Sequence, residues 1–113
     1  MSSKVVIVMW KAVAKPFMNI EKIHPHQQEA VGKMVELCKQ DPNIKRVVIF
    51  GSSVRDDCRP DSDIDIYYEF KKNPQFYPHV SSNRMFDNWS NFIVDRRLDY
   101  EICRTGVTVY EQG

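Results

Sequence analysis

The chain has 113 residues, of which 42% are hydrophobic and 27% charged, and 16 Lys and Arg against 15 Asp and Glu give a formal net charge of +1. A chain of this length forms one small domain and has no room for a second. The near-zero charge provides no general attraction for DNA or RNA, so a polynucleotide is an unlikely partner. No apolar stretch reaches the roughly 18 residues of a membrane span, and residues 5–10 are too short for a signal-peptide core. We therefore expect a cytoplasmic protein with no membrane association.

The three cysteines are Cys38, Cys58 and Cys103. They are odd in number, far apart, and contain no C-x-x-C pair. This pattern predicts reduced thiols and neither a disulfide framework nor a zinc site.

The first half of the chain divides into an extension, a helix and a strand. Residues 1–19 combine a β-branched run with Pro16, which would interrupt a helix, and we expect an edge strand or a docking arm ahead of a domain covering 20–113. From Pro25, apolar residues recur every three or four positions, which predicts an amphipathic helix ending near residue 41. Residues 45–50 are mostly apolar and β-branched and stop at Gly51, as a buried strand would.

The second half predicts two strands, a helix and a last strand. Strict alternation over residues 63–70 puts Asp63 and Asp65 on one face and apolar side chains on the other. Residues 71–83 read as a loop, and residues 84–89 as a short third strand. Apolar residues at i, i+4 and i+8, followed by Gly106, predict a helix over 91–105, and residues 107–110 a terminal strand.

Two short motifs bring chemistry to neighbouring strands. Gly51 lets the backbone turn at the end of a buried strand, and Ser52 offers a hydroxyl and exposed N–H groups to an anion. After ten further residues, Asp63 and Asp65 project from the same side of the next strand, about 6.6 Å apart along it. Oxygen ligands at this spacing can share two Mg²⁺ ions about 3.5 to 4 Å apart, the arrangement used in phosphoryl transfer.

Gly-Ser, ten residues and then Asp-x-Asp resembles the signature of the DNA polymerase β-like nucleotidyltransferase superfamily, and the wording is most similar to its minimal nucleotidyltransferases. The resemblance extends over roughly residues 21–112. It implies an α/β (α+β) nucleotidyltransferase fold, with a small mixed sheet of three to five strands and helices packed on one face. It also implies that Gly51, Ser52 and Arg55 bind nucleotide phosphates, although Arg55 could instead pair with an active-site carboxylate.

The family uses a third carboxylate on a strand before its last helix. The resemblance favours Asp87 for this role, which would make Asp63, Asp65 and Asp87 the catalytic and metal-binding set. Asp99 and Glu101 are the alternatives, and the apolar spacing places both inside the predicted helix. Family members usually carry an apolar residue after this acid, where this chain has Asn88.

The implied activity is transfer of a nucleotidyl group, AMP from ATP in the leading hypothesis, to an acceptor hydroxyl with a two-ion Mg²⁺ site, Mn²⁺ being an alternative. Minimal nucleotidyltransferases often act as the antitoxin of a helical HEPN-type partner protein, and a chain this short has no evident domain for the acceptor. Two other functions stay open: a non-catalytic antitoxin that masks its partner, and a small-molecule, antibiotic-modifying enzyme. The sequence also leaves open whether a homo- or hetero-oligomer forms.

Overall fold

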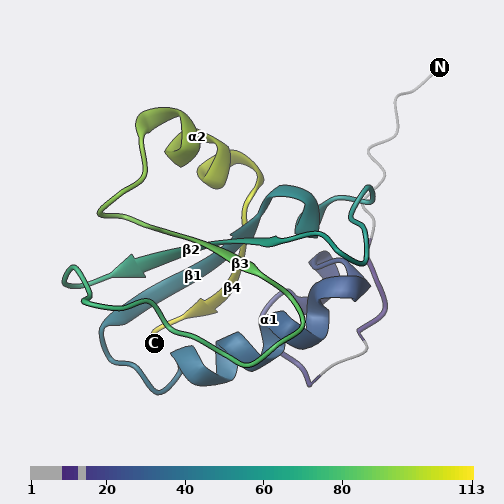
Figure 1. Ribbon diagram of the computed structural model, residues 1–113, viewed down its shortest axis with the longest axis horizontal. Coiled ribbons are helices and arrows are strands. Elements are labelled where there is room, and N and C mark those ends of the chain that lie inside the picture. Colours follow the sequence, from purple (N-terminus) through teal and green to yellow (C-terminus); the bar gives the residue numbers. More distant parts are fainter. Residues whose placement is uncertain (1–8, 13–14) are drawn as a thin grey trace.

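A mixed four-stranded sheet separates two helices in the computed structural model, which describes residues 9–12 and 15–113 (Figure 1). The strands are β1 (Ile44–Phe50), β2 (Ile64–Phe70), β3 (Phe86–Ser90) and β4 (Val107–Glu111), and the helices are α1 (Pro25–Cys38) and α2 (Arg96–Thr105). Two 3₁₀ turns, η1 (Ile20–Lys22) and η2 (Gly51–Val54), precede α1 and follow β1. The predicted α/β class and its mixed sheet are confirmed.

The sheet has the strand order β3-β2-β1-β4. Strand β1 is antiparallel to both β2 and β4, whereas β2 and β3 run parallel. A parallel pair cannot be joined by a tight turn, which explains the long irregular connection over residues 71–85. β3 therefore forms one edge of the sheet, beside β2.

The main core lies between α1 and one face of the sheet. Ile64, Ile66 and Tyr68 alternate along β2 toward this face and are fully buried against α1 residues such as Val31 and Met34. The helix begins with Pro25 in its first turn, where the ring removes only an N–H that has no helical partner. The period-two and period-3.6 patterns of the sequence meet in this layer, as predicted.

The prediction that both helices pack on one face of the sheet is wrong, because α2 covers the face opposite α1. Figure 1 shows α2 and α1 on opposite sides of the sheet. Ile102 of α2 packs in a separate small cluster with Val48, Phe50 and Tyr67, none of which belongs to the core against α1. Neighbouring residues of a strand face opposite sides, so β1 carries one apolar set for each helix. The sequence gives no sign of this second face, because residues 47–50 are all apolar and show no alternation.

The last helix also begins later than predicted, at residue 96 instead of 91. The amides of Ile93 and Val94 both donate to the Ser90 carbonyl at 3.1 Å, forming a turn after β3. Asp95 then caps α2 by accepting a hydrogen bond from the Leu98 amide at 2.8 Å. Val94 keeps the apolar spacing of the helix but precedes its cap.

The predicted extension over residues 1–19 lies partly outside the described residues, including the β-branched run at 5–8 and positions 13–14. Within residues 9–12 and 15–19 the structure has no strand. Trp10 lies against the domain, where its amide donates to the Glu21 carbonyl at 2.8 Å and its ring centroid is 5.1 Å from that of His24. Across the part of the chain that the structure describes, no helix has the length and apolarity needed to span a bilayer.

Candidate active site

Gly51 and Asp65 are packed against each other at the end of β1. Gly51 follows the strand with φ 74°, a conformation that side-chain-bearing residues rarely adopt. Antiparallel pairing puts Phe50 opposite Asp65, and a Cβ added to Gly51 would collide with the Asp65 carboxylate. The glycine therefore provides both the sharp turn into η2 and the space that the Asp65 carboxylate occupies.

The short turn η2 positions the serines of the Gly-Ser motif. The Arg55 amide donates to the Ser52 carbonyl at 3.0 Å, and the Ser53 carbonyl accepts from the His24 amide at 2.8 Å, which ties the turn to the start of α1. No side chain caps the beginning of η2. Ser52 is half-buried, whereas Ser53 is fully buried and its hydroxyl has no hydrogen-bond partner within the described chain.

Strand pairing brings Asp87 beside Asp65. In the parallel β2–β3 register these two residues are direct partners, which puts the negative charge of Asp87 close enough to act on the Asp65 carboxylate. Asp63 precedes β2 by one residue and is exposed. The turn in front of it is held by Gln27 of α1, whose side-chain amide donates to the Ser62 carbonyl at 2.9 Å. Elements far apart in the sequence thus converge on one group of carboxylates.

The electrostatics of this group centre on Asp65. Burial, together with the negative charges of Asp87, Glu101 and Asp63, raises its pKa from 3.8 to about 6. Both effects disfavour the ionised carboxylate: burial removes its hydration, and the neighbouring acids repel its charge. Perturbed acids of this kind are frequent at active sites because their charge serves a ligand or a reaction.

The two alternative acids occupy different places. Glu101 lies on α2, where it is half-buried and near enough to act electrostatically on Asp65. Asp99 lies on the same helix but acts on Tyr67 instead. Only Asp87 shares a strand register with Asp65, as the family pattern leads one to expect of the third carboxylate, and its catalytic role stays a prediction.

Arg55 is exposed and pairs with Asp57, the two side chains being 3.1 Å apart. Within the described residues it forms no ion pair with Asp63, Asp65 or Asp87, so the alternative of a structural pair with one of these acids is not realised.

Four residues of α2 line a cleft of about 530 Å³ together with Arg55: Arg97, Tyr100, Glu101 and Arg104. The sequence reasoning considered only Glu101 among them, as an alternative third carboxylate, and missed the other three. The spacing of all four at i, i+3, i+4 and i+7 puts them on one side of a helix, and this periodicity was the signal available in the sequence. The helix was predicted from its apolar positions alone, so the polar side was not considered as a site.

A family model described as Polymerase beta, Nucleotidyltransferase, matches residues 32–113, more than half of the chain and all of the acids above. The chain belongs to this family. A crystal structure of a putative nucleotidyltransferase from Sulfolobus solfataricus is 23% identical with a TM-score of 0.49, covering 73% of this chain and 78% of that chain. No curated protein matches.

The donor set of this nucleotidyltransferase fits divalent cations. Mg²⁺ and Mn²⁺ prefer oxygen ligands, and carboxylates come from Asp65 and Asp87, which are partners in β2 and β3, and from Asp63 just before β2. Burial and the negative charges of neighbouring acids raise the pKa of Asp65, and a cation bound beside it would favour its charged form. Among residues 9–12 and 15–113, no three such side chains already stand in ligating geometry.

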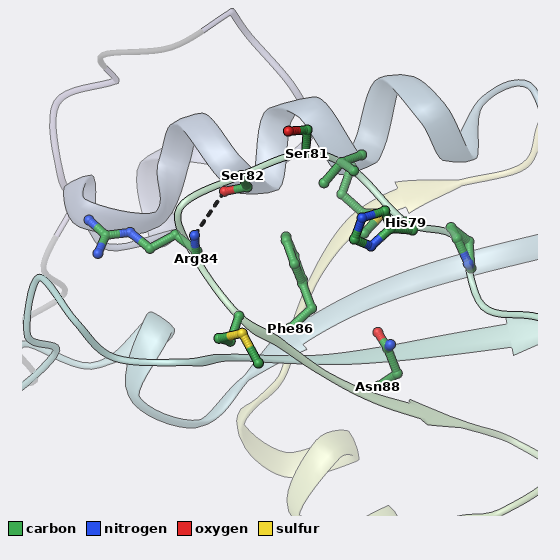
Figure 2. A pocket seen from close by; sticks show the side chains of 10 residues that line it. His79, Ser81, Ser82, Arg84, Phe86 and Asn88 are labelled. Atoms are coloured by element: carbon green, nitrogen blue, oxygen red, sulfur yellow. Dashed lines mark hydrogen bonds between the residues drawn. The ribbon is translucent and has the colours of Figure 1, made fainter.

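A second pocket of about 290 Å³ lies on the other face of β3, and Asn88 is among the residues that line it (Figure 2). Phe86 and Asn88 point from β3 toward α1 (Figure 2). Asp87 lies between them in the strand and therefore belongs to the opposite face. The buried Asn88 side-chain oxygen has no hydrogen-bond partner among the described residues. The same pocket is lined by His79, Ser81 and Ser82.

Proposed function

We propose that this nucleotidyltransferase transfers AMP from Mg·ATP to an acceptor hydroxyl, with Mn²⁺ able to replace Mg²⁺. The observation that carries the proposal is the strand register that sets Asp65 beside Asp87, with the Gly51 backbone closed against the same carboxylate. Phosphoryl transfer needs a turn that binds the phosphates and paired acids that bind metal ions, and the Gly-Ser turn and the acids of adjacent strands could supply them.

The residues divide the reaction between them. Asp63 and Asp65 would hold both cations, and Asp87 would complete the site nearer the acceptor. When bound, the cations neutralise charge on the attacking and leaving oxygens. Gly51, Ser52 and Arg55 orient the phosphates. The acceptor oxygen forms a bond to the α-phosphorus, its proton passes to Asp87, and the bond to the β-phosphate oxygen breaks so that pyrophosphate leaves with the electron pair.

The acceptor in this proposal is a hydroxyl on a partner protein, of the helical HEPN type, which the chain neutralises as an antitoxin. Asp87 is exposed and lies on the edge strand β3, so a separate molecule can approach it from outside the sheet. The resemblance to minimal nucleotidyltransferases supports this choice of partner.

The test combines the chain with each labelled nucleoside triphosphate, Mg²⁺ and a co-expressed HEPN-type partner, followed by mass spectrometry of both proteins. We expect AMP on the partner, and a loss of transfer of at least a hundredfold in Asp63→Asn or Asp65→Asn. Asp61→Asn is the matched control, because Asp61 is an exposed acid two residues before the motif. Mg²⁺ should also raise the melting temperature of the wild type but not of Asp65→Asn.

Unchanged transfer in Asp65→Asn would contradict the assignment of the metal site. A double variant at Asp63 and Asp65 that still neutralises the partner would show that masking, and not nucleotidyl transfer, is the relevant activity.

A further inference from the structure

The cleft beside α2 brings three guanidinium groups to the catalytic end of the sheet. Arg55 lines it from η2, and Arg97 and Arg104 line it from α2. The acid among its lining residues, Glu101, also acts electrostatically on Asp65, so the cleft adjoins the carboxylate group. Its volume of about 530 Å³ lies within the range of small-ligand sites.

The two cleft arginines of α2, Arg97 and Arg104, have no acidic partner within the described residues. Neither forms an ion pair there, although both are exposed and Asp99 and Glu101 lie on the same helix. Arg104 lies over the Tyr100 ring, 5.8 Å from its centroid, which restrains its side chain without neutralising its charge. Charged groups arranged in this way are suited to a polyanion.

The position of the cleft decides which polyanion. Asp65 lies on β2, with Asp87 on β3 to one side and the β1–η2 turn to the other. In an in-line displacement the attacking and leaving oxygens lie on opposite sides of the phosphorus. If the acceptor approaches at Asp87, the leaving group departs toward η2, where the arginine cleft begins.

We propose that Arg97 and Arg104 hold the β- and γ-phosphates of the substrate and the pyrophosphate that leaves. The inference rests on the proposed nucleotidyl transfer and adds two residues outside the Gly-Ser and Asp-x-Asp motifs. They act as positioning groups for the leaving group, with Arg55 on the opposite wall.

The direct test is calorimetric titration of the full chain with inorganic pyrophosphate in EDTA and low salt. We expect the double variant Arg97→Gln/Arg104→Gln to bind pyrophosphate about tenfold or more weakly, and each single variant about threefold. Arg96→Gln is the matched control, because Arg96 is an exposed arginine of the same helix that lines a different hollow, beside Tyr67. It should stay within about twofold of the wild type, as an exposed charge outside the cleft.

A kinetic test follows the same variants during transfer. The double variant should raise the KM for ATP and weaken product inhibition by pyrophosphate by similar factors, and Arg97→Lys/Arg104→Lys should restore part of each. Equal pyrophosphate affinity in the double variant and Arg96→Gln, or no binding by the wild type, would overturn the inference.

The two proposals fail separately. Pyrophosphate binding that is lost only in the double variant, in a chain that transfers no nucleotide, would leave the anion site standing and reject the function. Transfer that depends on Asp65 but is unaffected in the double variant would reject the anion site alone.

Discussion

The Asp65 carboxylate occupies the space where a side chain at position 51 would lie, so only glycine fits there. Gly51→Ala would add a Cβ at φ 74° and push against Asp65. We expect a loss of about 1 to 3 kcal/mol in the free energy of unfolding, together with most of the transfer activity. Urea denaturation and the transfer assay measure both effects.

Gly32→Ala is the control for that substitution. Gly32 lies in α1, and a Cβ there would only touch the Phe17 ring at 3.6 Å, an ordinary contact. Alanine is the better helix former, so this variant should be as stable as the wild type or more stable by up to about 1 kcal/mol. Equal destabilisation by both substitutions would contradict the special role of Gly51.

The pKa of Asp65 predicts how stability depends on pH. Burial and the neighbouring acids raise it from 3.8 to about 6, so the folded state holds this proton more tightly than the unfolded state. Stability from this group is therefore present below about pH 4 and is lost as pH rises through 6. Asp65→Asn should melt at a higher temperature than the wild type at pH 7.5, and the difference should shrink toward pH 4. Melting curves across this range test the sign.

At the scale of elements, α2 is attached to the sheet by few contacts and depends on its cap. The Asp95 carboxylate accepts a hydrogen bond from the Leu98 amide at 2.8 Å. Its negative charge also interacts favourably with the positive end of the helix dipole. Asp95→Ala should lower the free energy of unfolding by about 1 kcal/mol, while Asp95→Asn keeps most of the cap. Thermal and urea unfolding compare the two, and an equal loss in both would show that charge, and not the hydrogen bond, is what matters.

Most elements were predictable because each has a pattern of its own. The alternation over residues 63–70 located β2, and the three- and four-residue spacing after Pro25 located α1. The face covered by α2 was not predictable in the same way, since Val48 and Phe50 sit in an unbroken apolar run that gives no sign of two different partners. The helix start was missed because Val94 continues the apolar spacing across the turn before Asp95.

At the scale of the whole molecule, stability and chemistry lie on opposite faces of the sheet. Fourteen buried residues form the cluster on the α1 side, against four in the cluster beneath α2. A small cluster opens more readily than the main core, so α2 should be the less protected helix. Local opening of α2 would carry Glu101 and the cleft arginines away from Asp65.

Ile102→Ala tests this division. Ile102 is the buried residue of α2, 3% exposed, and its truncation should cost about 2 to 4 kcal/mol in the attachment of that helix. We expect faster amide hydrogen exchange in α2 and weaker transfer, with α1 and β2 still protected. Val109→Ala, on the α1 face, is the comparison, since it should lower protection throughout the domain. Uniform loss of protection in both variants would mean that the molecule unfolds as one unit.

The candidate site shows the same limit as the fold. Local motifs indicated Gly51, Ser52, Asp63 and Asp65, and family resemblance indicated Asp87. The cleft arginines come from a helix more than forty residues after the Gly-Ser motif, and nothing in the local sequence relates Arg97 to Arg55. Such pairs arise from packing, which the sequence expresses only through the fold.

The parallel pairing of β2 with β3 has a consequence for length changes in the chain. Residues 71–85 connect the two strands as an irregular segment, and additions at its exposed residues Gln75 and Phe76 alter no strand pairing. One residue inserted or deleted inside β3 ahead of Asp87 would turn its carboxylate to the α1 face and present a neighbour to Asp65. Designed insertions in this protein should therefore tolerate almost any length in the early connection and none within the edge strand.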